Sequence, residues 1–396
     1  MQNKTLPLEM CTGCSACQEI CPVNAITLNK DKYGFLFPET NHDLCISCGV
    51  CCNVCHLLNP IKRNNPIQVF AAQADDERIL KVSASGGVSN ILNFTAFQNG
   101  YIVYGASMRC HDTVNQNVSL SFRAANNEEE LKEFQGSKYF QSNLNDIYKD
   151  IQKNLLSGKK ILFTGLPCQV AGLKKFLHKD FSNLITVDIF CHGNTNQYLF
   201  EQYFKYLEKK FKSTISDYIF RDKERGTGYC SKIKLRNGKI KKFSTFEHCY
   251  WYLMQYSKIN MKVCYSCQYS STERVGDISL GDFWGIEKTM PELINKELNK
   301  YYGISVILVN TSRGKEFLNQ AKYLKLYESN LSYVLPYASA LQRKNCEPEN
   351  RKYILNLYKN GGYEKVKKYC IKEMGQSYYK MIIKDKIKSL LKMNRR

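Results

Sequence analysis

Two cysteine runs near the N-terminus have the residue type and spacing that most directly predict chemistry. "CTGCSACQEICP" starts at Cys11 and "CISCGVCCNVC" starts at Cys45, and both space four cysteines as C-x2-C-x2-C-x3-C. The chain has 18 cysteines in 396 residues, and its first residues contain no apolar segment of the kind that a secretory signal requires. We therefore expect a cytoplasmic protein whose cysteines bind metals or take part in redox reactions, rather than a disulfide framework.

Each run resembles the iron–sulfur motif of bacterial ferredoxins, and the two copies predict two [4Fe-4S] clusters. Three closely spaced thiolates on a tight loop bind three irons of one cubane, while the fourth cysteine points toward the neighbouring cluster. Zinc needs only four ligands and would leave the second set of three cysteines unexplained. The expected ligands of the first cluster are Cys11, Cys14, Cys17 and Cys55. Those of the second are Cys45, Cys48, Cys51 and Cys21.

Four later cysteines predict a third site. Cys168 in "TGLPCQVAG" and Cys191 in "FCHG" each follow a predicted strand, and Cys264 and Cys267 form a C-x2-C pair in "VCYSCQ". The carboxyl ends of parallel strands meet at one edge of a sheet, and a later loop can supply two more ligands there. We hypothesise a third [4Fe-4S] cluster on these four cysteines. The alternatives are a nucleophilic Cys168, which lacks an evident histidine partner, a structural zinc and unrelated buried thiols.

The pattern of apolar residues indicates which elements position these cysteines. Strands are predicted at 66–74, 101–108, 118–124, 159–163, 184–190 and 302–310, and helices at 87–100, 145–158 and 169–177, with a hairpin turn at Asn237-Gly238. The sequence therefore predicts an α+β chain with a small ferredoxin-type domain, a larger mixed α/β domain and a basic helical tail. The expected boundaries are 1–62 for the first domain, 67–150 and 151–345 for the two parts of the second, and 346–396 for the tail.

The segment "SASGGVSN", residues 83–90, precedes a predicted helix and is the best candidate for a phosphate-binding loop. Its glycines expose backbone N–H groups, its serines add hydroxyl donors, and the helix N-terminus adds positive potential. A plain helix N-cap is the simpler interpretation. No G-x-G-x-x-G follows a predicted strand, and the chain contains no G-x-x-x-x-G-K-[ST] motif, so common dinucleotide and P-loop sites are not indicated.

Seven motifs occur in an order that resembles the family of coenzyme F420 hydrogenase/dehydrogenase beta subunits. They are "SASGGVSN", "QGSKYFQS", "GLPCQVAG", "VDIFCHG", "IFRDK", "CYSC" and "DISLGDFWG". The resemblance implies a flavin-binding domain that carries FAD and an iron–sulfur cluster, with a deazaflavin or another two-electron acceptor. The chain departs from the family at "NTNQ" after "CHG" and at "ERGTGY" after "FRDK", which affects the acceptor pocket most directly.

The resemblance also implies roles for individual residues. Candidates for binding the flavin phosphates are Ser85, Gly86, Gly87 and Ser89. Lys138 would balance the charge of a phosphate or of the reduced flavin, unless it is a surface lysine near a helix end. Asp282 and Trp284 would line the flavin or acceptor cleft, with core packing as the alternative for Trp284.

These observations predict an iron–sulfur flavoprotein oxidoreductase that passes electrons between [4Fe-4S] clusters and a two-electron acceptor or donor through FAD. The cofactors perform the redox steps and the protein positions them, so no catalytic side chain is assigned. The rival interpretation is a ferredoxin-type relay or partner-binding protein without flavin.

The net charge of +21 is concentrated partly at the C-terminus, where residues 351–396 have 14 Lys and Arg against 3 Asp and Glu. Ile383, Ile387, Leu390 and Leu391 recur there at helical spacing. Such a basic amphipathic helix lies on an anionic membrane surface, docks on an acidic partner or packs against the protein's own core. The expected partners are a redox protein or a small-molecule electron acceptor, with peripheral membrane contact through the tail as a further alternative and no nucleic acid.

Overall fold

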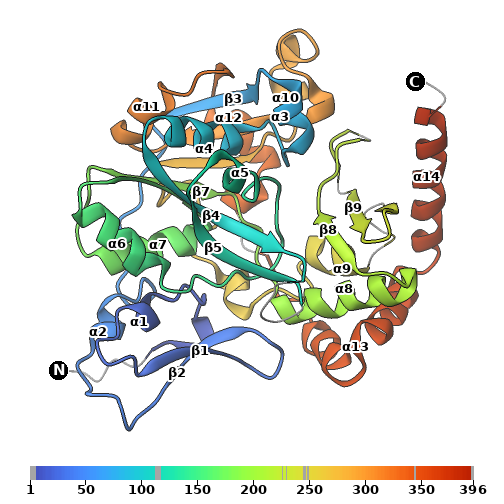
Figure 1. Cartoon of the computed structure of the whole chain (residues 1–396). Coiled ribbons are helices and arrows are strands. Elements are labelled where there is room, and N and C mark those ends of the chain that lie inside the picture. Colours follow the sequence, from blue (N-terminus) through green and yellow to red (C-terminus); the bar gives the residue numbers. More distant parts are fainter. Residues whose placement is uncertain are drawn as a thin grey trace.

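The computed structural model describes residues 6–111, 117–224, 226–228, 230–243, 247, 249–342 and 345–393, with the side chains of 384–386 and 388–393 left aside. Figure 1 shows a small N-terminal module at the lower left, a large sheet domain above it and a mainly helical region on the right. This arrangement confirms the predicted mixed class with a ferredoxin-type module and a larger α/β domain. Among the described residues, no helix is long and apolar enough to span a membrane.

The N-terminal module consists of a short hairpin and three short helical turns that carry the cysteine runs. Its elements are the 3-10 turn Leu8–Met10, α1 (Ala16–Glu19), β1 (Ile26–Lys30), β2 (Leu36–Thr40) and α2 (Val50–Asn53). β1 and β2 pair in antiparallel fashion. Gly13 lies between the first two cysteines of its run and Gly49 between the second and third of the other, with φ values of 65° and 72°, a conformation that glycine adopts without strain.

The large domain is built on one eight-stranded sheet with the order β13-β3-β12-β11-β7-β6-β4-β5. The strands are β3 (Gln68–Ala74), β4 (Tyr101–Arg109), β5 (Ser119–Ala125), β6 (Lys160–Gly165), β7 (Leu184–Ile189), β11 (Ile278–Asp282), β12 (Ser305–Val309) and β13 (Leu324–Ser329). The central strands β4, β6, β7 and β11 are parallel, and antiparallel strands complete both sides. The carboxyl ends of β6, β7 and β11 therefore meet at one edge, where a ligand site is expected.

Helices cover both faces of this sheet. One face packs on α4 (Val88–Gln98), α5 (Glu128–Lys132) and α11 (Ser312–Leu318); the other packs on α6 (Ile147–Leu156), α7 (Pro167–Leu177), α10 (Ile286–Thr289) and α12 (Leu331–Val334). α3 (Glu77–Val82) lies beside β3, and short 3-10 turns occur at Pro291–Leu293, Lys300–Tyr302, Leu335–Tyr337 and Ser339–Leu341. Both faces of the parallel strands are therefore buried, as their apolar sequences predict.

A long insertion separates β7 from its neighbour β11 and forms a second core. It contains α8 (Gln197–Phe211), the sheet β8 (Ile215–Ile219), β9 (Ser231–Leu235) and β10 (Ile240–Phe243), α9 (Cys249–Gln255) and the turn Lys262–Ser266. The C-terminal helices α13 (Arg351–Met374) and α14 (Gln376–Met393) follow, and α13 contributes buried residues to this core. The insertion matters for the site because it returns the chain to the sheet edge with Cys264 and Cys267.

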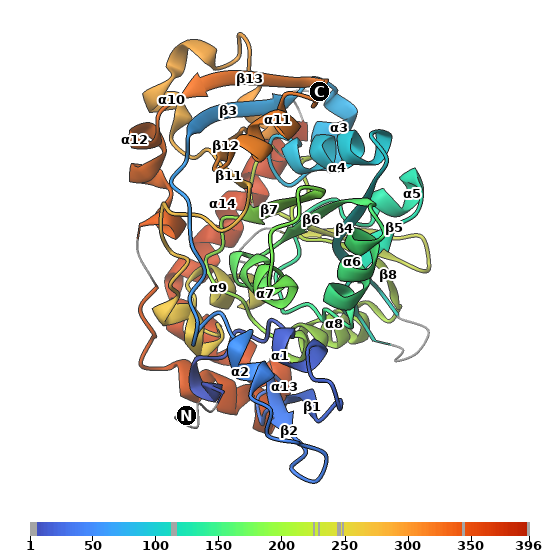
Figure 2. The same ribbon diagram turned by 90° about the vertical axis from the view of Figure 1, so that its left-hand side faces the viewer.

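The N-terminal module docks on α6 and α7, as the two views of the molecule show (Figures 1 and 2). Ala16 and Val54 of the module are fully buried in the core that these helices form. The Glu19 carboxylate accepts hydrogen bonds from the backbone N–H groups of Tyr148 and Lys149, at 2.8 and 3.0 Å. Glu19 thereby supplies acceptors to the first turn of α6, which has unpaired donors of its own.

Candidate functional site

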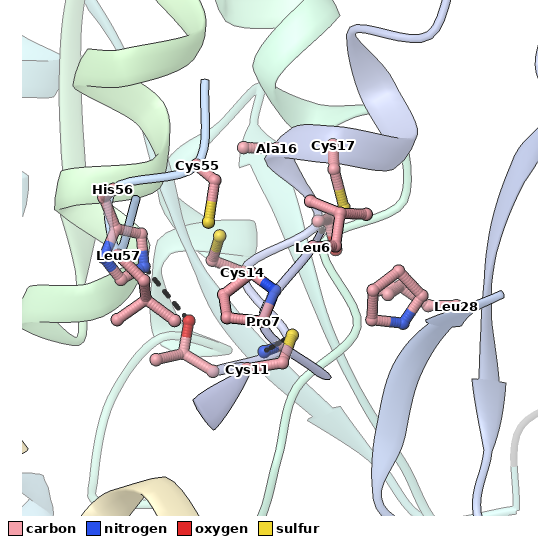
Figure 3. A pocket seen from close by; sticks show the side chains of 14 residues that line it. Leu6, Pro7, Cys11, Cys14, Ala16, Cys17, Leu28, Cys55, His56 and Leu57 are labelled. Carbon is pink, nitrogen blue, oxygen red and sulfur yellow. Dashed lines mark hydrogen bonds between the residues drawn. The ribbon is translucent and has the colours of Figure 1, made fainter. Parts of the chain in front are cut away.

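The first sulfur set, Cys11, Cys14, Cys17 and Cys55, converges as the spacing of the two runs predicts. The four side chains line one pocket, and Figure 3 shows their sulfurs directed into the same space. Three of them come from the first run, and Cys55 comes from the end of the second run. The structure thus brings together the four residues expected at one cubane, including the exchange of the fourth cysteine between runs.

Burial and mutual repulsion control the protonation of this set. Burial, with a smaller effect from Cys14, raises the pKa of Cys11 to about 12. Burial also raises the pKa of Cys14 to about 11 and that of Cys17 further, with neighbouring thiols adding to the shift. Without a cation, these groups stay protonated; coordination to iron replaces the protons and stabilises the thiolates. The donor set fits a [4Fe-4S] cluster chemically.

His56 links this set to the large domain and was not identified as a functional residue from the sequence. Its Nε2 lies 3.1 Å from the Thr12 hydroxyl, and its Nδ1 lies 2.7 Å from the Tyr269 hydroxyl. Burial lowers the pKa of His56 to about 4, so the imidazole is neutral near pH 7. The signal in the sequence is its position: His56 stands after Cys55 where Pro22 stands after Cys21.

The second sulfur set, Cys21, Cys45, Cys48 and Cys51, lies closer to solvent. Cys48 is exposed and Cys45 is half-buried. Burial raises the pKa of Cys51 to about 11, and the neighbouring Cys52 and, to a smaller extent, Cys48 add to the shift. Leu44 and Ile46 beside these cysteines are 52% and 62% exposed. The second set therefore occupies a surface region with exposed apolar side chains.

The third sulfur set, Cys168, Cys191, Cys264 and Cys267, assembles at the sheet edge. Cys168 follows β6 at the start of α7, Cys191 follows β7, and the other two lie at the end of the insertion. Burial raises the pKa of Cys168 well above its usual value, with added repulsion from the other three thiols. Burial likewise raises the pKa of Cys191 to about 11, with Cys267 contributing to the shift. These mutual effects place the four cysteines near one another at the sheet edge, and their binding of a cluster stays a prediction.

Neither this group nor the N-terminal runs include a tight cluster of three or more His, Cys, Asp or Glu side chains around one metal-ion position, within the described ranges. The electrostatic neighbours of Cys168 are cysteines, Cys14 among them.

The first and third sets approach each other through α7 and Cys14. A Cβ added at Gly172 would lie 3.1 Å from the Cys14 sulfur, so glycine permits the close approach of α7. Tyr148 is fully buried next to both groups, and the Cys14 and Cys168 thiols help to raise its pKa, which burial already raises strongly. The Tyr148 hydroxyl donates to the Gln169 carbonyl oxygen at 2.8 Å. Buried protein groups, Tyr148 among them, thus lie between the two sulfur sets.

The segment 83–90 packs tightly against the sheet at the end of β3. The Gly86 N–H donates to the Ser305 hydroxyl at 3.0 Å, and the Ser85 hydroxyl donates to the Ile304 carbonyl oxygen at 3.2 Å. A Cβ at Gly86 would lie only 2.5 Å from the Ala72 carbonyl oxygen. These two predicted phosphate donors already have partners within the protein.

Gly87 starts α4 with a φ of 80°, and no side chain among the described residues caps this helix end. The first N–H groups of α4, including those of Val88 and Ser89, have no intrahelical acceptor. Ser89 is half-buried. The donors that remain for an anion at this loop are therefore those of the helix N-terminus.

A line of charged residues connects this loop with the third sulfur set, and sequence reasoning assigned no role to two of them. Lys223 is buried and donates to the carbonyl oxygens of Ser85 and Tyr302. Burial, with a smaller effect from Arg221, lowers the pKa of Lys223 to about 7. Arg221 pairs with Asp282 at 2.8 Å at the end of β11. Arg221 and Lys223 both belong to the "IFRDK" motif, and this motif was the feature of the sequence that could have identified them as site residues.

His192 continues this line toward the sulfurs, because it directly follows Cys191. Burial lowers the pKa of His192, while the nearby Asp282 carboxylate opposes the shift. The structure thus brings Ser85, Asp282 and Cys191 to the same end of the sheet. Trp284, just beyond β11, is 40% exposed, which contradicts the alternative that it packs in the core.

Lys138 lies apart from this line. Its ammonium donates to the carbonyl oxygens of Glu133 and Gln135, at 2.8 and 2.9 Å, after the end of α5. Burial lowers the pKa of Lys138 to about 7. Lys138 is half-buried, and its described contacts are with the helix end, as in the alternative of a lysine near a helix end, rather than with residues 83–90.

The comparisons with known proteins address these domains directly. The family model for the C-terminal region of the beta subunit of coenzyme F420 hydrogenase/dehydrogenase matches residues 158–330, which include all four cysteines of the third set. The chain contains this domain. A "4Fe-4S dicluster domain" model matches residues 10–57, which contain both N-terminal runs. The resemblance drawn from the seven motifs and the two cysteine runs is confirmed.

Two curated relatives match parts of this protein. The chain is 23% identical over 171 residues to the F subunit of the F(420)H(2) dehydrogenase of Methanosarcina mazei, covering 41% of this chain and 46% of the relative. It is 43% identical over 55 residues to "Uncharacterized ferredoxin MJ0265" of Methanocaldococcus jannaschii, covering 13% of this chain and 30% of the relative. The chain therefore spans less than half the length of either relative.

A solved structure, the F420-reducing [NiFe] hydrogenase complex from Methanosarcina barkeri, is 15% identical with a TM-score of 0.42. That match covers 78% of this chain and 93% of the other.

Proposed function

We propose that this protein is an FAD-dependent iron–sulfur oxidoreductase with three [4Fe-4S] clusters. The observation that carries the proposal is the third sulfur set: four cysteines from separate elements meet at the sheet edge, next to Cys14 of the first set. A chain of sulfur sets from the exposed Cys48 to the half-buried Cys168 is an arrangement suited to electron transfer. The iron–sulfur part follows from the dicluster domain; the third cluster, FAD and the acceptor are the proposed additions.

The residues that would hold each group follow from the geometry of the sulfur sets. The N-terminal sets would hold two clusters, and the third set would hold one beneath the line formed by His192, Asp282 and Arg221. A structural zinc on the third set is the competing metal, and metal analysis distinguishes the two.

FAD would lie between the third sulfur set and the N-terminus of α4. Its phosphates would meet the N–H groups of Val88 and Ser89 at the start of α4, and Lys223 would hold the loop in place through its contact with Ser85. Asp282 and the exposed Trp284 would border the isoalloxazine or the acceptor. Bound FAD would supply the exchange between single electrons and electron pairs. The protein's own part is to orient the flavin, exclude water and fix the charges around it.

The electron carrier would dock at the second sulfur set. Leu44 and Ile46 are exposed there beside Cys48, and apolar contacts of this kind are usual in interfaces between proteins. The named relative is a subunit of a dehydrogenase, which supports a protein redox partner. A deazaflavin, a nicotinamide and a free flavin are all candidate two-electron acceptors for the opposite end.

The flavin-less relay is the second candidate, because Ser85 and Gly86 already use their donors within the protein. Anaerobic reconstitution of the full chain followed by acid release of flavin tests this difference. The oxidoreductase predicts about twelve irons, as three clusters of four, and one FAD per chain. The same iron content without FAD uptake would contradict the flavoenzyme and support the relay.

Lys223→Met sharpens that experiment, with Lys234→Met as the matched control. Lys223 is buried under the loop, whereas the Lys234 side chain is 54% exposed on β9. We expect FAD to bind at least tenfold more weakly to the Lys223 variant, with its iron content unchanged and the Lys234 variant behaving like the wild type. Equal FAD affinity in all three proteins would remove the proposed flavin position.

A further inference from the structure

Among the described side chains of the C-terminal helix α14, one group of apolar residues packs against the protein and a second group is exposed. Tyr378 is buried in the core of the insertion, and Met381 and Ile382 are partly buried against it. Tyr379, Ile383 and Ile387 are 59%, 57% and 50% exposed. These three positions are four residues apart, so they form one row along the helix. For this row, packing against the protein's own core is excluded.

The charge of α14 complements the exposed row. The sequence of α14 has five lysines and one aspartate, and Lys380, next to Tyr379, is exposed. An apolar row on a helix rich in lysine is the pattern of helices that lie in the interface of an anionic membrane. Leu390 and Leu391, which the sequence adds to the same pattern, have side chains outside the described set.

The position of α14 leaves its exposed row accessible. Figure 1 shows α14 as the outer element on one side of the molecule, while the N-terminal module lies on the other side, and in the view of Figure 2 α14 lies behind the sheet domain. Gly375, with a φ of 54°, turns the chain between α13 and α14. A surface that contacts α14 would leave Cys48 and the second sulfur set free for an electron carrier.

We propose that α14 docks on the surface of an anionic lipid membrane through Tyr379, Ile383 and Ile387. The apolar side chains enter the boundary between headgroups and acyl chains, and the lysines contact the anionic headgroups. The helix lies along the surface and does not cross the membrane. This function is independent of the iron–sulfur and flavin chemistry.

Vesicle flotation of the full-length protein tests the proposal. The vesicles contain either phosphatidylcholine alone or phosphatidylcholine with phosphatidylglycerol, and the salt concentration is varied. We expect binding to the anionic vesicles only, with weaker binding at high salt because exposed charges are screened. An acidic protein surface is the competing occupant, and poly-glutamate is its probe. Absence of vesicle binding overturns the proposal, and binding to poly-glutamate in its place would assign the helix to an acidic partner.

The decisive variant is Ile383→Glu/Ile387→Glu, with Leu156→Glu/Ile240→Glu as the matched control. Leu156 and Ile240 are 64% and 53% exposed and lie outside α14, so both variants add two charges at exposed sites. The α14 variant should bind anionic vesicles at least tenfold more weakly, while the control should lose less than threefold. Equal losses in the two variants would show a general charge effect and overturn docking by this face. Unchanged thermal unfolding of both variants shows that the fold is intact.

Discussion

The first and third sulfur sets have the same four-cysteine chemistry but are built in opposite ways. The first comes from one stretch of the chain, Cys11–Cys55, in a module whose elements are three to five residues long. The third is assembled at the ends of β6 and β7 and at the end of a long insertion, on a sheet with a buried core on both faces. The first site depends on local loops, whereas the third depends on the topology of a stable domain.

This difference predicts how each site depends on its metal. A small module with few buried apolar side chains gains much of its folding free energy from metal binding. A site at the edge of a large sheet is positioned before any metal binds. We therefore expect the N-terminal module to need its metal for folding, and the third sulfur set to be positioned by the fold alone.

Removal of iron should have the largest effect on amide hydrogen exchange, and the effect should differ between the N-terminal module and the large sheet. In the apoprotein, we expect amide hydrogens of β1 and β2 to exchange at least a hundredfold faster than in the iron-loaded protein. Those of β6, β7 and β11 should keep most of their protection, because their hydrogen bonds lie within a buried sheet. Hydrogen exchange with mass spectrometry measures both regions in one sample. Equal loss of protection in the two regions would contradict the comparison.

A second prediction concerns buried charge at the sheet edge, where protein contacts rather than metal fix the geometry. The pKa of Lys223 in the folded protein is about 7, below its value of about 10.4 in an unfolded chain. Between these values the unfolded state binds more protons, so this lysine makes the free energy of unfolding rise with pH. Lys138 acts in the same direction.

Replacing Lys223 with Met should remove one such contribution. From pH 7.5 to 8.5, the free energy of unfolding of the wild type should rise relative to the variant by up to about 1.4 kcal/mol. Denaturant unfolding at each pH, with Lys234→Met as the control, measures this difference. A difference that does not change with pH would mean that Lys223 is charged in the folded protein.

The smallest predicted effect is at the contact between the two sulfur sets. Gly172→Ala would place a methyl group 3.1 Å from the Cys14 sulfur and 3.0 Å from the Tyr148 hydroxyl, so both sets must move apart by a few tenths of an ångström. We expect weaker magnetic coupling between the reduced clusters, measured by electron paramagnetic resonance, and little change in stability. Gly228→Ala is the control, since a Cβ there meets no atom within 4 Å. Identical spectra for the two variants would contradict the close approach through α7.

The comparison also explains what could be predicted from the sequence. Both N-terminal runs were identifiable because their ligands are local and their spacing is specific. Cys168 and Cys191 could be placed at one edge because each follows an apolar strand, and parallel strand ends converge. The family resemblance supplied the flavin candidates.

Other features depend on contacts between distant segments, which no local pattern contains. His56 reaches Tyr269 across 213 residues, and Lys223 reaches Ser85 across 138. The hydrogen bond from the Gly86 N–H to the Ser305 hydroxyl could not be predicted either, because β3 and β12 become neighbours only in the folded sheet. The exposure of Ile383 depends on which face of α14 packs on the insertion, and helical spacing alone does not determine this.

The third cluster that we propose at the sheet edge can be tested by iron analysis of Cys191→Ser. Cys191 lies at the end of β7, remote in sequence from both N-terminal runs, and its substitution leaves their eight cysteines intact. After anaerobic reconstitution, we expect about twelve irons per wild-type chain and about eight in the variant, with one fewer cluster signal on reduction. If the wild type holds only about eight irons, or if the variant keeps every iron of the wild type, the four cysteines at the sheet edge do not bind a cluster.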